Sequence, residues 1–117
     1  MKRRRGLWII VACLFVAATA TAADRSAGQT LSAQCVDCHG NDGYSARGDL
    51  PNLAHQKEVY LALQLRRFRD VIRKRFGTSP PAGPQTGSRN HPVMNLQAGL
   101  LSDDEIQHLA AYYAGLS

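Results

Sequence analysis

A short run of reactive side chains, Cys35-Val36-Asp37-Cys38-His39, is the part of this sequence best suited to chemistry. Two thiols separated by two residues on a helical turn can add to the two vinyl groups of one porphyrin. The histidine that follows can supply an imidazole ligand to the porphyrin iron. This C-x-x-C-H pattern is typical of a c-type haem attachment site, so we predict covalent haem at Cys35 and Cys38, with His39 as an iron ligand.

Two other uses of a C-x-x-C pair fit the surrounding sequence less well. A thioredoxin-like dithiol requires a strand–helix–strand context, and no strand-like run stands near Cys35. A structural zinc site needs two further ligands at close spacing. No cysteine follows Cys38, and the other histidines are scattered at positions 55, 91 and 108. Zinc and dithiol chemistry therefore remain as minor alternatives to haem.

The first 23 residues have the composition of a secretory signal peptide. Four basic residues at positions 2–5 precede an apolar stretch from Leu7 to Ala18. The small residues that follow allow cleavage near Ala22 or Ala23. We therefore predict a leader over residues 1–23, export to the periplasm, and one domain over residues 24–117. Bacterial attachment of c-type haem takes place outside the cytoplasm, which fits this destination.

Cys13 lies inside the predicted leader and leaves two alternatives open. The sequence around it loosely resembles a bacterial lipoprotein cleavage box, but cleavage there would leave an apolar start, residues 14–18, on the mature protein. We interpret Cys13 as a small apolar residue that is lost with the leader. A retained leader is the other alternative, since residues 7–23 are at the short end for a membrane span. Contact with a membrane is expected only if the leader is retained.

The charge of the chain gives no support to nucleic-acid binding. The whole chain carries 14 Lys and Arg residues against 9 Asp and Glu, a formal net charge of +5. Four of the basic residues belong to the leader, so residues 24–117 carry only +1. A basic face large enough for nucleic acid is therefore not expected. A domain of this size has a small core, which a large apolar cofactor would complete.

The remaining chain is expected to be helical. Residues 24–38 form one predicted helix that runs into the cysteine motif, and residues 57–76 form a second, with apolar residues every three or four positions. A capping box formed by Ser102 and Glu105 begins the closing helix. Its buried stripe is predicted to be Ile106, Leu109, Ala110, Tyr113 and Leu116. Residues 40–56 and 77–101 are rich in turn-forming residues and are expected to be loops.

In their chain order, these parts resemble the class I cytochromes c, which are small electron carriers with one haem. The shared parts are a first helix ending at C-x-x-C-H, a proline about a dozen residues later, a middle helix, a methionine-bearing loop and a closing amphipathic helix. In the cytochromes c′ the motif lies near the C-terminus, which does not fit Cys35. The resemblance implies an all-α cytochrome c fold, with three to five helices and long loops wrapped around one covalently bound haem c.

The resemblance also implies how the iron is held. The carbonyl of Pro51 would accept a hydrogen bond from the second ring nitrogen of His39, which fixes the ring. Met94, the only methionine after Met1, would be the distal ligand. His91, three residues away, is the alternative ligand. His55 is expected to be structural or exposed, and His108 is expected to be solvated.

The expected function is a periplasmic electron carrier and not an enzyme. It would pass single electrons between membrane or soluble oxidoreductases, and no nucleophile–base pair suggests other chemistry. The alternative is a haem-bearing subunit, or a gas or peroxide sensor, with a labile or open distal site. The basic residues in 66–75 have two general interpretations: a solvated helix face, or a docking patch for an acidic partner. In a third interpretation, one arginine, Arg69 or Arg89, pairs with a haem propionate.

Overall fold

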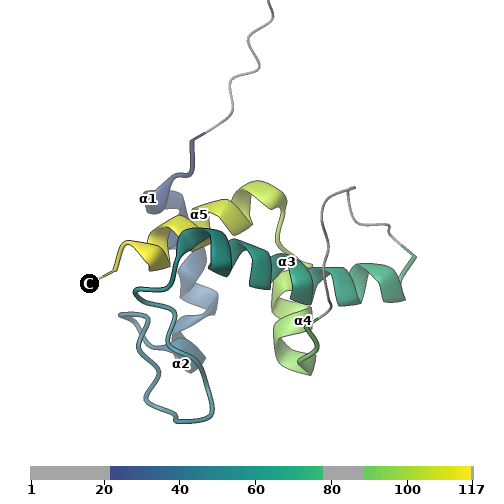
Figure 1. The fold of residues 1–117 in the computed structure, drawn as a ribbon, viewed down its shortest axis with the longest axis horizontal. Helices are drawn as coiled ribbons and strands as arrows, with labels where there is room; N and C mark the ends of the chain where they lie inside the picture. Colours follow the sequence, from purple (N-terminus) through teal and green to yellow (C-terminus); the bar gives the residue numbers. More distant parts are fainter. Residues whose placement is uncertain (1–21, 78–88, 117) are drawn as a thin grey trace, which may run out of the picture.

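A computed structural model describes residues 22–77 and 89–116, and all regular structure within them is helical (Figure 1). The predicted leader lies outside these residues except for its last two positions. None of the helices in the described ranges is long and apolar enough to cross a membrane. In chain order the elements are α1 (Arg25–Leu31), the 3-10 turn η1 (Ser32–Gln34), α2 (Val36–His39), α3 (Glu58–Arg75), α4 (Pro92–Gly99) and α5 (Asp103–Ala114).

The predicted single helix over residues 24–38 is wrong in one respect, because it is broken in the middle. Asp24 caps α1 by accepting hydrogen bonds from the backbone amides of Ser26 and Ala27. At the break, the buried Ser32 hydroxyl donates to the Gln29 carbonyl at 2.7 Å. A local bond of this kind competes with the helical ladder and bends it. Helix α2 therefore begins after the break as a separate short helix.

Helix α3 confirms the prediction made for residues 57–76. Lys57 is its N-cap and Phe76 its C-cap, and the positive φ of Gly77 (75°) ends it. A left-handed residue after a helix is most easily supplied by glycine. The stripe buries Leu61, which packs in the core with residues of α5, and Phe68.

The prediction that residues 77–101 form a loop throughout is wrong for Pro92–Gly99, which form α4. The helix begins because His91 caps it with its side chain and Pro92 occupies the first turn, where a missing N–H costs nothing. Ala98 of α4 is fully buried. The other face of α4 is apolar but exposed, so the helix lacks the simple buried stripe that would have indicated it.

Helix α5 begins and packs as predicted. The Ser102 hydroxyl accepts from the Glu105 amide at 3.2 Å, and the Glu105 carboxylate accepts from the Ser102 amide at 2.8 Å, which completes the capping box. Ile106 and Leu109 are almost completely buried. Helix α1 crosses α5 so closely that a Cβ on Gly28 would lie 2.0 Å from the His108 carbonyl oxygen. Helix α3 packs against α5 and α4 (Figure 1).

The interpretation of residues 66–75 as a solvated face is wrong at Arg69, whose side chain is fully buried. Its guanidinium donates to Asp103 Oδ1 at 2.8 Å and to the Leu101 carbonyl at 3.4 Å. Arg66 Nε also lies 3.6 Å from Asp103. A buried guanidinium is tolerated when it is paired in this way. Arg69 therefore joins α3 to the start of α5 and is engaged away from the cavity described below.

Candidate functional site

One cavity of about 610 Å³ gathers the residues that the sequence singled out. In Figure 1, α2 and α4 lie on the same side of α3. Side chains of these three helices and of α5 line the cavity. Its volume lies within the range of about 300–1,000 Å³ that is usual for cofactor sites. The predicted site residues that line it are Cys35, Cys38, His39, Pro51 and Met94. Much of the remaining wall is apolar, including Leu61, Leu65, Phe68, Leu109 and Ala110.

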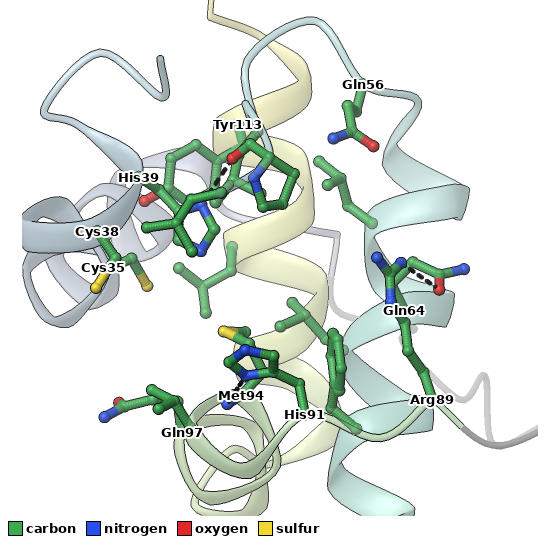
Figure 2. A pocket seen from close by; sticks show the side chains of 18 of the residues that line it. Cys35, Cys38, His39, Gln56, Gln64, Arg89, His91, Met94, Gln97 and Tyr113 are labelled. Atoms are coloured by element: carbon green, nitrogen blue, oxygen red, sulfur yellow. Dashed lines mark hydrogen bonds between the residues drawn. The ribbon is translucent and has the colours of Figure 1, made fainter. Parts of the chain in front are cut away.

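The two cysteines are free thiols at one end of this cavity. Cys35 is the N-cap of α2 and Cys38 lies within the helix, so both sulfurs point to the same side (Figure 2). Cys35 is half-buried and Cys38 is exposed. Burial raises the pKa of the Cys35 thiol. The pair is therefore presented to the cavity as a closely spaced dithiol.

The His39 imidazole is buried at the end of α2 and is oriented by a single hydrogen bond. Its Nδ1 lies 2.8 Å from the Pro51 carbonyl oxygen. A carbonyl oxygen only accepts, so Nδ1 must carry the proton, and in the neutral ring the free lone pair then lies on Nε2. This is the nitrogen that a metal could bind while the other is held by its hydrogen bond.

The loop after α2 brings Pro51 back to His39. Gly40 and Gly43 both have positive φ, 80° and 78°, which suits glycine. The Gly43 carbonyl then accepts from the Leu53 and Ala54 amides at 2.7 and 3.1 Å. The turn chemistry of this segment thus fixes the carbonyl that contacts the imidazole.

Met94 and His91 lie on the wall opposite His39 (Figure 2). Met94 is half-buried on α4, whereas His91 is exposed. His91 Nδ1 accepts from the Met94 amide at 3.4 Å as the cap of α4. In the neutral ring this places the proton on Nε2, so neither nitrogen of His91 keeps a free lone pair.

The end of the cavity away from the thiols contains Arg89, one of the two arginines considered above for a haem propionate, and Gln64, which sequence reasoning did not single out. Arg89 donates to Gln64 Oε1 at 2.9 Å and lies over the Phe68 ring, 5.1 Å from its centroid. Gln64 is buried, and Arg89 also lies 3.5 Å from the Tyr60 hydroxyl. A signal for Gln64 was present, because it is a polar residue on the apolar stripe that also contains Leu61 and Phe68.

His55 and His108 do not reach the cavity. His55 is exposed and stands with its ring centroid 5.9 Å from that of Tyr44. His108 is half-buried, and its Nδ1 accepts from the Asp24 amide at 2.8 Å, so it has a structural role where a solvated side chain was expected. No group of three or more His, Cys, Asp or Glu residues in the ranges 22–77 and 89–116 is arranged to hold a metal ion.

The residues around the cavity fit a haem. The apolar walls suit a flat macrocycle, the thiol pair can bond to its edge, and an imidazole and a thioether are available on opposite walls. Imidazole nitrogen and thioether sulfur are donors that haem iron accepts in proteins.

A sequence model of the cytochrome c family matches residues 26–117, and this chain belongs to that family. Together with the all-helical fold, the match identifies a class I c-type cytochrome, with one covalently bound haem c at the C-x-x-C-H motif of residues 35–39.

Known relatives agree with this assignment. Cytochrome c4 of Azotobacter vinelandii is 39% identical over 92 residues, which cover 79% of this chain and 40% of the relative. Cytochrome c-554(548) of Halomonas halodenitrificans is 34% identical over 93 residues, which cover 80% of this chain and 96% of the relative. The chain thus spans about two fifths of the length of the first relative and nearly all of the second.

A solved structure supports the fold as well. Reduced recombinant cytochrome c4 from Pseudomonas stutzeri superposes with a TM-score of 0.62 at 33% sequence identity. The match covers 82% of this chain and 47% of that chain. The predicted cytochrome c fold is confirmed.

Proposed function

We propose that this protein is a periplasmic electron carrier whose single haem is bonded to Cys35 and Cys38 and ligated by His39 and Met94. The observation that carries the proposal is that His39 and Met94 lie on opposite walls of one cavity, with both thiols at its end. When bound, the haem supplies an iron that alternates between Fe(II) and Fe(III).

Cys35 and Cys38 are free thiols placed as attachment requires. Each thiol adds across one vinyl double bond, so that its sulfur and its hydrogen end on neighbouring carbons, and the addition needs no oxidant. The two free thiols stand on one short helix, which fixes their separation. Covalent attachment then keeps the cofactor in a domain whose own core is small.

His39 is suited to the proximal position because its ring is held before any metal arrives. The Pro51 carbonyl fixes both the tautomer and the orientation, and it makes Nε2 a better donor. His39 is only 5% exposed, so little solvent competes for the nitrogen.

Met94 is better suited than His91 to the distal position. The His91 ring is used to cap α4, which leaves its nitrogens engaged. The Met94 thioether has no competing partner of this kind and lines the cavity. A thioether favours Fe(II) more than a second imidazole would, so this ligand set gives a raised potential. With both axial positions filled by protein, the iron is suited to electron transfer and not to binding a substrate.

Export to the periplasm rests on the leader predicted over residues 1–23, since attachment of c-type haem in bacteria occurs outside the cytoplasm. The partners of a carrier of this kind are redox proteins, either soluble or in the membrane.

One observation favours a second candidate function, that of a haem subunit within a larger oxidoreductase. The solvent face of α4 presents Val93, Leu96 and Leu100, which are 53%, 61% and 81% exposed, beside the Met94 wall. An apolar surface in such a position fits a permanent partner. Chromatography of the native protein from its own cells distinguishes the two, because a carrier elutes alone and a subunit elutes with its complex.

The proposal is tested by expressing the whole chain in a bacterium that matures c-type cytochromes. Haem stain is then applied to the denatured periplasmic fraction on a gel, where only covalently attached haem remains with the chain. We expect one stained band for the natural sequence and none for the double variant Cys35→Ala/Cys38→Ala. If the natural chain is exported and folds but its band on the denaturing gel takes no haem stain, the proposal is contradicted.

A further inference from the structure

We propose that Arg89, held in place by Gln64, binds a haem propionate and helps to set the reduction potential of this protein. This inference rests on the proposed function, since it requires the haem to occupy the cavity. It gives Arg89 a role in binding the cofactor, and it gives Gln64 and Phe68 a role in positioning Arg89.

The location of Arg89 carries the first step. Haem has its two vinyl groups on one edge and its two propionates on the opposite edge. The thiols that would bond to the vinyl groups stand at one end of the cavity, and Arg89 and Gln64 stand at the other (Figure 2). The edge that carries the carboxylates is therefore directed toward Arg89.

The charge of Arg89 carries the second step. Two arginines line the cavity in the described part of the chain, Arg47 and Arg89. Arg47 is already paired with Asp49 through two hydrogen bonds. Arg89 has only neutral partners among the described residues, namely Gln64, Tyr60 and the Phe68 ring. A guanidinium beside an apolar cavity gains most from an anion, and carboxylate is the anion whose geometry its planar fork matches.

The partners of Arg89 carry the third step. Gln64 is 9% exposed, and its Oε1 accepts from Arg89 Nη1 at 2.9 Å. The guanidinium also lies over the Phe68 ring, 5.1 Å from its centroid, which favours a cation–π contact. An arginine that is oriented by a buried amide and a ring loses little freedom when it binds, so the site is built in advance for a carboxylate.

The test compares haem-loaded variants with the natural protein. Arg89→Gln removes the cation, Arg89→Lys keeps the charge but loses the fork, and Arg75→Gln makes the same charge change at an exposed position on α3. Two quantities are measured: the midpoint potential, and the propionate bending band in the resonance Raman spectrum.

We expect Arg89→Gln to lower the potential and to shift the propionate band, because an uncompensated carboxylate favours Fe(III). Arg89→Lys should recover part of the potential, and Arg75→Gln should leave both quantities unchanged. If Arg89→Gln leaves the potential and the band as in the natural protein, the inference is wrong.

A second variant covers the case in which Arg89→Gln yields too little haem protein to measure. Gln64→Met keeps the volume of the side chain but cannot accept from Arg89, so it should move both readouts in the same direction by a smaller amount. No movement would again overturn the inference. Failure of the proposed function is recognised separately, because the natural protein would then show no haem stain at all.

Discussion

His39 Nδ1 and the carbonyl oxygen of Pro51, twelve residues later, lie 2.8 Å apart across the mouth of the loop that follows α2. The contact links the orientation of the imidazole to the conformation of the backbone that carries the carbonyl. Changes in the loop that never touch the cavity should therefore be felt at the iron.

Gly43→Ala tests this link. Gly43 has φ 78°, and an added Cβ would meet the Ala54 amide nitrogen at 2.9 Å, so the loop must shift. We expect a loss of about 1–2 kcal/mol in the free energy of unfolding. We also expect a higher midpoint potential, because a looser hydrogen bond to His39 makes its Nε2 a weaker donor and so stabilises Fe(III) less. Denaturant unfolding and redox titration measure the two effects.

Gly48→Ala is the matched control for this experiment. An added Cβ on Gly48 meets no atom within 4 Å. Its stability and potential should match those of the natural protein. Equal effects of the two substitutions would contradict the link between loop and ligand.

The pair formed by Arg69 and Asp103 should make stability depend on pH. The hydrogen bond from Arg69 holds the pKa of the Asp103 carboxyl below its usual range. The pKa of Asp103 is therefore lower in the folded protein than in the unfolded chain, where it is about 3.9. The stability that the ion pair adds is fully present above the unfolded pKa and is lost as the pH falls through the folded pKa. Asp103→Asn should cost on the order of 1 kcal/mol at pH 7, because the carboxylate is half exposed although its partner is buried.

Denaturant unfolding at several pH values checks this prediction. The difference between Asp103→Asn and the natural protein should shrink as the pH falls below about 4. Asp104→Asn, in the same first turn of α5, separates the ion pair from the general effect of the helix dipole and should cost less. A difference that stays constant down to low pH would show that the carboxylate charge is not involved.

The sequence could predict α3 and α5 because each has a regular buried stripe with clear end signals. It could not predict α4, whose stripe of Val93, Leu96 and Leu100 faces solvent and whose start depends on a histidine cap. The break in the first helix arises from one buried hydroxyl, that of Ser32, which no periodicity indicates.

Local sequence patterns also could not predict contacts between residues that are far apart in the chain. The burial of Arg69 depends on Asp103, 34 positions later. The candidate site was more accessible, because the spacing of its cysteines and histidine is dictated by the geometry of one cofactor. The roles assigned to Cys35, Cys38, His39, Pro51 and Met94 stay predictions.

The crossing of α1 and α5 provides a further prediction. Gly28→Ala would place its Cβ 2.0 Å from the His108 carbonyl oxygen and 2.7 Å from the Tyr112 Cβ. The helices must separate, so we expect a loss of roughly 1–3 kcal/mol or more in unfolding free energy. Thermal unfolding followed by circular dichroism checks it, with Ala33→Ser, at an exposed position, as control. A Gly28→Ala protein as stable as the natural one would contradict this helix packing.

Substitutions on the distal wall should separate the two candidate ligands. Met94→Ala removes the thioether, and we expect a clearly lower midpoint potential and a site that admits added ligands. His91→Ala should weaken the cap of α4 by about 1 kcal/mol but keep the potential close to that of the natural protein. Redox titration of both variants decides between them. A large change in potential for His91→Ala, with the potential of Met94→Ala close to that of the natural protein, would assign ligation to the histidine.

The central claim is that His39 and Met94 both bind the iron and leave no open position. Titration of the natural ferrous protein with carbon monoxide, followed by its absorption spectrum, tests this claim most directly. The account predicts an unchanged spectrum for the natural protein and ready binding by Met94→Ala. Prompt stoichiometric binding of carbon monoxide by the natural protein would contradict it and would favour the sensor or open-site function.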